Sequence, residues 1–516
     1  MIAQGVLPFE FVPETRKTTL TAFAGLPVYL DLAAAIGLRE SLERHVEIGE
    51  RGQGWSDAQV VTSLVLLNLA GGDSVDDLRI LEGDSGFGRV LRRTEMRGMS
   101  RRDRRAAERR FRQGRQRSVP SPSAARRSLL RFVNRESEAE RGPGRAYIPS
   151  PSERLTGLRR VNTALLAFYQ KRRPEKHATL DMDATLVETT KDDALYGYKK
   201  FKAFQPLNTY WLEQGTVVHS EFRDGNVNAG YDHLRILKES LAMLPEGVET
   251  VSMRSDTAGH QWDLIRYCAE GKNERFGVID FAIGAKVTTA LKNAIREVDE
   301  AAWKPIPRIK DGECVSTEQQ WAEVCFESNA SSSRKDAPRL RFIATREPVK
   351  QLEIEGMESQ QTLPFPTMDM DAGAETIQYK VHALVTNRLD MPGELVIQWI
   401  RGRCGRSEGE HAVMKEDLAG GTLPSQQFGV NAAWWAIMIL ALNLNVIMKT
   451  LVLGPGWERK RMKAIRFGFI NAAARVQERG RRLFLRIQRD NPVSDLLIAA
   501  RMRILELALP PPDLAV

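Results

Sequence analysis

Apolar side chains recur every three to four residues in two segments near the start of the chain, 26–46 and 56–72. This spacing places them on one face of a helix and predicts amphipathic helices. Ser56 is suited to cap the second helix and Gly71 to end it. A further helix is predicted after Ser121, which precedes a proline at the first helical position. The beginning of the chain is therefore expected to be a set of short helices.

From residue 177 the pattern changes to apolar runs of strand length that alternate with helical segments. One strand, a hairpin and then a strand–helix–strand unit imply a mixed sheet flanked by helices, an α/β architecture. The predicted strands lie in 177–190, 209–225, 248–256 and 275–287, and the predicted helices in 232–245 and 261–271.

The segment from about 300 to 392 is rich in strand-like runs, such as 339–349 and 377–387, separated by polar loops. Helical patterns return near 393. The expected organisation is a helical region 1–135 with an arginine-rich segment 92–117, a linker and helix 136–176, the first part of the core 177–300, a β-rich insertion 301–392, and a last helix with a C-terminal helical region 393–516.

The longest apolar run of the chain extends over residues 432–454. Asn443, Asn445 and Lys449 interrupt it, so that a buried core helix is favoured over a membrane span. No membrane partner is expected on this ground.

The composition describes a soluble globular protein of several domains, because 516 residues with 42% hydrophobic and 27% charged side chains exceed a single core. Four cysteines without a Cys-x-x-Cys pair indicate neither a zinc knuckle nor a disulfide framework. The first residues carry acidic side chains and lack an apolar core, which predicts no secretory signal. A cytoplasmic setting is expected.

Positive charge is concentrated in one segment, 92–117. It contains twelve arginines and three acidic residues, so its net charge of +9 equals that of the whole chain. Like charge of this density opposes folding unless an anion neutralises it, and arginine is well suited to phosphate. Either a nucleic-acid contact or a solubilising surface accounts for it. The basic side chains that would face phosphate include Arg101, Arg102, Arg104 and Arg105 in this segment and Arg126, Arg127 and Arg131 on the following helix.

The chemistry of the chain centres on Asp181 and Asp183 in the predicted strand 177–190. Alternate residues of a strand project to one face, so both carboxylates point the same way. Carboxylates in an apolar stretch need a cation or hydrogen bonds, which makes a metal site plausible. Asp256 is the best second contributor, because it stands at the carboxyl end of another predicted strand. The third acid is expected on a later helix, which offers Glu408, Glu410, Glu416 and Asp417.

These motifs, "LDMDAT", "EFRDGNV", "RSDTAGH" and "RCGRSEGEHAVMKEDLAGG", occur in an order that resembles the bacterial DDE insertion-sequence transposases, in particular insertion-sequence family 1380. The resemblance extends over most of the chain, and it implies a ribonuclease-H-like core in which three carboxylates bind two divalent cations. Carried over by motif, the catalytic and metal-binding acids are Asp183, Asp256 and Glu408, with Asp181 and Glu410 as the alternate or supporting acids. The glutamate signature of related transposases is matched by Arg403 and Lys415, but an isoleucine replaces its tyrosine and the spacing after Arg403 is one residue longer.

The resemblance further implies two Mg²⁺ ions per active site, for which Mn²⁺ can substitute. It implies cleavage of the element ends and attack of the 3′-hydroxyl on target DNA. The expected partners are double-stranded DNA, as terminal inverted repeats and target, and a second copy of the chain in a homodimer at the nucleoid. Expected phosphate contacts are Arg403, Lys415, Arg223 and Asn226, with Lys463 and Arg466 as further candidates. Arg223 and Asn226 are equally consistent with a plain hairpin turn.

The interval between the acids is uneven, because Asp183 and Asp256 are 73 positions apart and Asp256 and Glu408 are 152 apart. A β-rich insertion before the last helix explains the difference. Trp303 and Trp321 within it could stack on a flipped base, although core positions are commoner for tryptophan. His260 could line the site or stand beside solvent at a helix start.

Two other functions are compatible with parts of the sequence. An apolar run followed by Asp-x-Asp-x-Thr also opens haloacid-dehalogenase-like phosphatases, in which Asp181 would be the nucleophile. The long preceding region and the arginine-rich segment argue against that class. The other is a transposase-derived DNA-binding protein without catalysis, which would not need three separate carboxylates.

Overall fold

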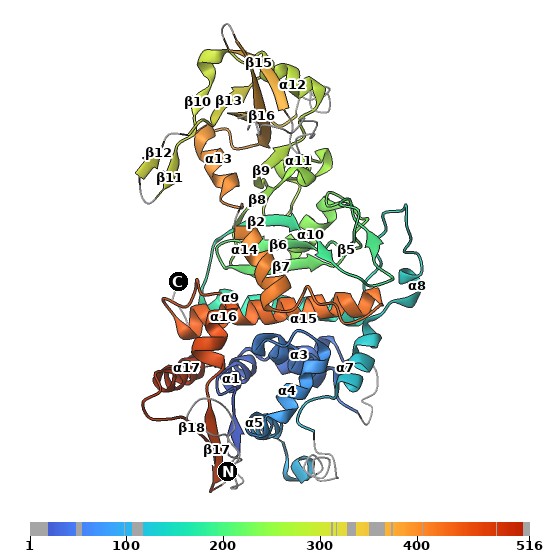
Figure 1. Cartoon of the computed structure of the whole chain (residues 1–516), viewed down its shortest axis with the longest axis vertical. Coiled ribbons are helices and arrows are strands. Elements are labelled where there is room, and N and C mark those ends of the chain that lie inside the picture. The colour runs from blue at the N-terminus through green and yellow to red at the C-terminus, as the bar shows by residue number, and fades with distance from the viewer. Residues whose placement is uncertain are drawn as a thin grey trace, which may run out of the picture.

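The structure is a computed structural model, and it describes residues 19–47, 54–97, 99–105, 117–310, 313–315, 317–327, 337–349, 367–372, 375–404, 406–480 and 482–508. Its long axis runs from a β-rich end to a helical end, with the central sheet between them (Figure 1). Both ends of the chain contribute to the helical end.

Within the described residues, a mixed sheet of 10 strands runs from the middle of the molecule into the β-rich end. In one half of it the order is β7-β6-β2-β8-β9, in which β2 pairs antiparallel with β6 and parallel with β8, and β8 pairs parallel with β9. The hairpin and the strand–helix–strand unit predicted from sequence account for this half. Its strands are β2 (His177–Ala184), β6 (Leu207–Trp211), β7 (Thr216–Glu221), β8 (Thr250–Ser255) and β9 (Asp280–Ala285).

Strand β2 is buried on both faces from Ala178 to Met182, and its sequence alternates between apolar and polar side chains. Leu180 and Met182 belong to a hydrophobic core shared with the two crossover helices, α10 (His233–Met243) and α11 (Trp262–Ala269). The alternate positions, Asp181 and Asp183, therefore face the opposite side of the sheet.

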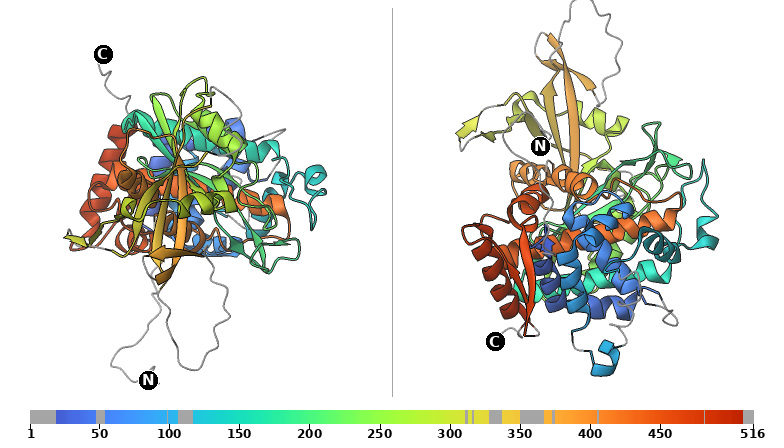
Figure 2. Two further views of the ribbon diagram at one scale, coloured as in Figure 1. Left: turned by 90° about the horizontal axis from the view of Figure 1, so that it is seen from above. Right: turned by 60° about the horizontal axis from the view of Figure 1, so that its bottom comes forward.

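The β-rich segment continues the same sheet, because β16 pairs antiparallel with β9. From there the order is β16-β14-β13-β10, and β15 also pairs with β16. The strands are β10 (Lys304–Pro305), β13 (Gln320–Val324), β14 (Arg341–Pro348), β15 (Thr367–Ala372) and β16 (Glu375–Thr386), with a separate pair β11 (Arg308–Lys310) and β12 (Glu313–Val315) and the helix α12 (Thr289–Arg296) beside them. Figure 2 shows the long strands projecting from the end opposite to the N-terminal helices.

The helical end has one hydrophobic core, to which residues from the first and the last parts of the chain contribute. Its central element is α15 (Phe428–Ile447), which contacts α3 (Asp57–Ala70) and α9 (Glu153–Arg172). The other helices described outside the β-rich end are α1 (Leu26–Ile36), α2 (Leu38–His45), α4 (Leu78–Gly83), α5 (Ser85–Glu95), α7 (Pro122–Leu129), α8 (Arg135–Glu138), α16 (Met462–Ile465) and α17 (Val493–Ala508). α13 (Gly393–Arg401) packs instead against β9 and β13, and α14 (Arg406–Ala412) follows it in the chain.

The helix signals of the N-terminal region are confirmed. Ser56 forms a capping box with Gln59, and Gly71 ends α3 in the left-handed conformation. Ser121 caps α7. Segment 26–46 forms two helices and not one, because Gly37 adopts a φ of 77° between them.

The apolar run 432–454 is a core helix, as predicted. α15 and the π-helical turn Met448–Leu453 together are long and apolar enough to cross a membrane, but 78% of the apolar window is buried within the protein. Such burial is typical of the core helix of a globular protein.

The C-terminal region contains strands that the sequence did not predict. β17 (Ala474–Arg479) and β18 (Arg482–Arg486) form a hairpin, and β17 also pairs with β1 (Leu20–Thr21). This small sheet joins the two ends of the chain.

Candidate functional site

Asp183 and Asp256 lie side by side at the carboxyl ends of two neighbouring parallel strands. The register of β2 and β8 pairs His177 with Thr250 and continues without a shift to Met182 and Ser255. Asp183 and Asp256 are the next residues in this register, since all the pairs differ by the same 73 positions. The backbones of the two aspartates are therefore neighbours at the edge of the sheet where α/β folds place ligands.

Asp256 is half-buried and also caps the short 3-10 turn Thr257–Gly259. Its Oδ1 accepts a hydrogen bond of 2.9 Å from the backbone N–H of Ala258. This contact fixes the side chain at the strand end, and its second oxygen, Oδ2, is the one left to take part in a site.

The carboxylate of Asp183 is paired with Arg403, which follows α13. Nη1 of Arg403 lies 3.1 Å from Oδ2 of Asp183, and both side chains are largely buried, with 11% and 21% exposed. A guanidinium thus stands beside Asp183 where a metal ion would otherwise balance the carboxylate charge.

A pocket beside Asp183 brings the sheet and α14 together. Tyr210 on β6 donates its hydroxyl to Oε1 of Glu410 at 3.3 Å. Glu410 is half-buried, whereas Glu408 in the first turn of α14 is exposed. The pocket is lined by Asp181, Asp183, Asn208, Tyr210, Glu410, His411 and Met414.

Burial lowers the pKa of His411 to about 4, with a further contribution from the positive charges of Lys415 and Arg403. The ring is therefore neutral near pH 7 and adds no positive charge to the pocket. Lys415, one turn further along, is half-buried and donates through Nζ to the carbonyl of Leu186 at 3.5 Å. Leu186 lies three residues after Asp183, so Lys415 is held near the end of β2.

Asp181 is neutralised by an arginine of the neighbouring strand. Nε and Nη2 of Arg254 lie 2.6 Å from Oδ1 and Oδ2 of Asp181, a bidentate pair in which both side chains are almost fully buried. The same guanidinium donates to the backbone carbonyl of Trp399 on α13. Asp181 therefore has a structural partner and ties β2, β8 and α13 together.

The sequence did not single out Arg254, Asn208, Tyr210 or His411 as site residues. Arg254 could have been found, because it precedes Asp256 by the same two positions by which Asp181 precedes Asp183. Parallel pairing then sets the charges opposite each other. For Tyr210 and His411 the sequence offers no signal, since their place depends on how α14 packs against β6.

The donor set suits a hard divalent cation, because carboxylate oxygens are the ligands that Mg²⁺ prefers. Asp183 and Asp256 would hold it, with a glutamate of α14. Within the part of the chain that the structure describes, no group of three or more His, Cys, Asp or Glu side chains is arranged to hold a metal ion. The carboxylates fit such an ion in chemistry, and Arg403 is ion-paired with one of them.

The basic residues of the N-terminal region are on the surface. Arg101, Arg102, Arg104 and Arg105 are all exposed on one short helical stretch, and Arg127 and Arg131 are exposed on and after α7. Arg126 is ion-paired with Asp76. Residues 106–116 of the arginine-rich segment lie outside the described residues.

Several other residues expected to contact phosphate have structural partners. Arg223 is 1% exposed, pairs with Glu221 at 2.8 Å and donates to the carbonyl of Tyr231, so in this conformation it is not accessible to a phosphate. Asn226 donates to the carbonyls of Gly142 and Arg145. Arg466 donates to the carbonyls of Leu69 and Asn68 at the end of α3, while Lys463 is exposed.

The tryptophans of the β-rich segment are buried. Trp303 is 6% and Trp321 is 7% exposed, and their rings lie under Arg346 and Lys304 at 4.2 and 5.3 Å from the ring centroids. Both tryptophans therefore occupy core positions. His260 is half-buried and accepts a hydrogen bond from the backbone N–H of Lys286.

Comparison with known proteins places the chain in context. No curated protein matches its sequence. The chain is similar to a solved structure described as the cryo-EM structure of the piggyBac transposase synaptic complex with hairpin DNA, at 11% identity and a TM-score of 0.41, covering 96% of this chain and 83% of that chain. A family model described as "Transposase DDE domain group 1" matches residues 14–509, nearly the whole chain.

Proposed function

The chain belongs to the transposase DDE domain group 1 family, and from that premise we propose that it cuts the ends of an insertion sequence and joins the 3′-hydroxyls to target DNA. The observation that carries the proposal is the register that sets Asp183 beside Asp256 at the ends of β2 and β8. A transposase of this kind needs carboxylates at one point of a rigid sheet, and these two strands supply them.

The strand order β7-β6-β2-β8-β9 supports a ribonuclease-H-like core for this half of the sheet. An antiparallel three-strand meander followed by two parallel strands leaves the carboxyl ends of β2 and β8 at the same edge. The strands after β9 then form the proposed β-rich insertion, and α14 returns the third acid to the site.

The third acid is Glu408 by its spacing in the sequence, and Glu410 is its alternative. The position of Glu410 in the pocket of Asp183, held by Tyr210, supports the alternative. The family pattern of six residues before Lys415 supports Glu408. Substituting each glutamate in turn and measuring DNA cleavage distinguishes between them.

Asp183, Asp256 and a glutamate of α14 would hold divalent cations, and the chemistry these would supply is activation of a water or 3′-hydroxyl and stabilisation of the leaving oxygen. Basic side chains of the site position the DNA. Arg403 exchanges the Asp183 carboxylate for a phosphate of the DNA, and Lys415 neutralises a second phosphate near the end of β2. The neutral His411 leaves the negative potential of the carboxylates undiminished.

The exposed arginines of the N-terminal region, including Arg101, Arg102, Arg104, Arg105 and Arg127, are proposed to bind the phosphates of the terminal repeats. Since transposition joins two ends, a homodimer on DNA is part of the proposal. Arg223 is not proposed to contact DNA, because its side chain is buried.

A DNA-binding protein without nuclease activity is the second candidate, and the pairing of Arg403 with Asp183 is the observation that favours it. A phosphatase is disfavoured, because Asp181 is neutralised by Arg254 and is not available as a nucleophile.

The test is a cleavage assay with the full chain and an end-labelled duplex that contains the DNA flanking its coding sequence. Strand cuts at a fixed position that require Mg²⁺ and disappear with EDTA are the expected result. Binding of the duplex without cleavage in either Mg²⁺ or Mn²⁺ would leave the DNA-binding protein as the function.

A further inference from the structure

A small three-stranded sheet, which we call the hairpin, follows the end of β2. Its three strands, β3 (Val187–Glu188), β5 (Lys202–Phe204) and β4 (Leu195–Tyr196), form a separate sheet with β5 in the middle. Val187 follows Asp183 by four residues, so this segment begins next to one of the proposed metal ligands.

The base of this hairpin is firmly attached to the protein. Ala203 and Phe204 are fully buried, and the carbonyl of Ala203 accepts from the backbone N–H of Gly225 at 2.9 Å. Gly225 has no space for a side chain, because an added Cβ would lie 2.5 Å from that carbonyl oxygen. The hairpin is therefore packed tightly against the turn after β7.

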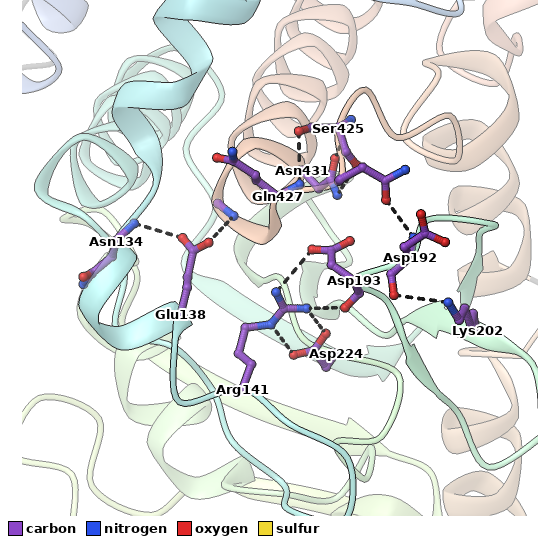
Figure 3. A network of polar contacts seen from close by, with 12 residues as sticks. Asn134, Glu138, Arg141, Asp192, Asp193, Lys202, Asp224, Ser425, Gln427 and Asn431 are labelled. Carbon is purple, nitrogen blue, oxygen red and sulfur yellow. Dashed lines mark hydrogen bonds and ion pairs between the residues drawn. The ribbon is translucent and has the colours of Figure 1, made fainter.

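Polar contacts fasten the segment before β4 as well (Figure 3). Arg141 donates to both carboxylate oxygens of Asp224 at 2.7 Å and to Asp193, and its guanidinium lies over the ring of Phe428. The backbone N–H of Asp192 donates to the side chain of Gln426 at 2.7 Å. The hairpin is thus bound to the linker and to the start of α15 at the same time.

The tip of the hairpin, residues 196–200, is in contrast open to solvent. Tyr196 is 64% and Tyr198 is 72% exposed, and Lys199 and Lys200 are exposed beside them. Lys199 Nζ lies 5.9 Å from the centroid of the Tyr198 ring. Two tyrosine rings and two lysines therefore gather on one fixed turn.

The turn is also conformationally strained. Lys200 has a φ of 64°, in the left-handed region that residues other than glycine, asparagine and aspartate seldom adopt.

We propose that the hairpin tip binds unpaired nucleotides of a DNA strand, with Tyr196 and Tyr198 stacking on bases and Lys199 and Lys200 contacting the adjoining phosphates. Exposed aromatic rings stack on bases of any sequence, and lysines follow the backbone. In a duplex the faces of the bases are covered by their neighbours, so the rings select an unpaired strand.

The inference rests on the proposed function for its setting, because strand cutting at Asp183 is what would release such a strand beside the hairpin. Its role would be to hold the freed strand away from the carboxylates while the joining step occurs. A rigid base is required for this, and the contacts of Arg141, Gln426 and Gly225 provide it.

Binding measurements with the full chain in EDTA test the inference separately from catalysis. The probes are a fluorescent single strand of mixed sequence, about 15 nucleotides long, and the same strand in a blunt duplex. Replacing both tyrosines by alanine (Y196A/Y198A) is expected to weaken single-strand binding by about tenfold or more, with a smaller effect on the duplex. The matched variant Y196F/Y198F keeps the rings and is expected to bind as the wild type does.

A second variant, K199Q/K200N, removes the charges and places at position 200 a residue that tolerates a positive φ. It is expected to reduce the salt dependence of single-strand binding, whereas K171Q, at an exposed lysine of α9, is not. Unfolding midpoints equal to that of the wild type show that each variant is folded.

Equal single-strand affinity of the wild type and Y196A/Y198A, or equal losses for the single strand and the duplex, would overturn the inference. Neither result depends on cleavage. If the wild type fails to cut DNA but the alanine variant loses single-strand binding, the proposed function fails and the inference stands.

Discussion

Arg403 lies with Nη1 3.1 Å from Oδ2 of Asp183, so that the first proposed metal ligand is held by a basic residue of the chain itself. The pair joins the end of β2 to the segment between α13 and α14. Any cation that binds Asp183 competes with this guanidinium, and any phosphate that binds Arg403 releases the carboxylate. In the proposed function, DNA binding and metal binding are therefore linked through this ion pair.

Replacing Arg403 by glutamine is expected to strengthen the binding of Mn²⁺ to the protein without DNA, because the carboxylate of Asp183 loses its competitor. DNA cleavage is expected to fall in the same variant, since the phosphate contact is lost. Electron paramagnetic resonance measures the bound Mn²⁺ directly. Unchanged Mn²⁺ affinity in R403Q would contradict the proposed link, and R401Q, on the neighbouring α13, serves as the control.

The two glutamates of α14 are separated by comparing E408Q with E410Q in the cleavage assay. Each substitution keeps the shape of the side chain and removes its charge, so the one that binds metal is expected to abolish cleavage. The other is expected to retain activity near that of the wild type. Loss in E408Q alone requires α14 to turn its exposed first turn toward Asp183 when metal and DNA bind, and loss in E410Q alone is consistent with the pocket as it stands. Full activity in both variants would remove α14 from the site.

The neighbouring places of Asp183 and Asp256 could be predicted from sequence because they depend on local patterns. Each aspartate follows the buried residues of a predicted strand, and the two strands pair in parallel. The third acid could not be fixed in the same way. Glu408 and Glu410 differ in which side of a short helix they occupy, and this depends on packing against Tyr210, 198 to 200 residues earlier in the chain.

Substituting Asp181 by asparagine leaves the buried guanidinium of Arg254 without its carboxylate. Loss of one partner of a buried ion pair is expected to destabilise the fold by roughly 3–5 kcal/mol. Thermal unfolding of D181N measures this effect, and the double variant D181N/R254M is expected to recover part of it. If D181N instead keeps its unfolding midpoint and loses cleavage, Asp181 is a reacting group and not a structural one.

Neutralising Arg101, Arg102, Arg104 and Arg105 together is expected to flatten the salt dependence of duplex binding. Each phosphate contact contributes roughly 0.9 to the slope of log affinity against log salt, so four contacts change it by up to about 3.6. The control is R39Q, in an arginine that is paired with Glu43 on α2. A slope that stays at the wild-type value would assign these arginines to solubility.

The fold shows the same division between local and distant information. The N-caps of α3 and α7, Ser56 and Ser121, directly precede the helices they begin, and the sequence predicted both. The pairing of β1 with β17 joins residues about 450 positions apart, and the hairpin of β17 and β18 has the many charged residues of a helix surface. The pairing of β1 with β17 was not predicted, because strand pairing over such a distance leaves no periodic signal in one sequence. The hairpin was not predicted, because its charged residues resemble those of a helix surface.

The central claim, that Asp183 and Asp256 together bind the catalytic metal, is tested most directly by exchanging the metal-binding atom. In D183C and D256C a thiolate replaces a carboxylate, and sulfur ligands disfavour Mg²⁺ more strongly than softer cations such as Mn²⁺. Both variants are expected to be inactive on labelled element ends in Mg²⁺ and to regain cleavage in Mn²⁺, whereas D183A and D256A remain inactive in both. Cleavage in Mg²⁺ by either cysteine variant at the wild-type rate would contradict the claim.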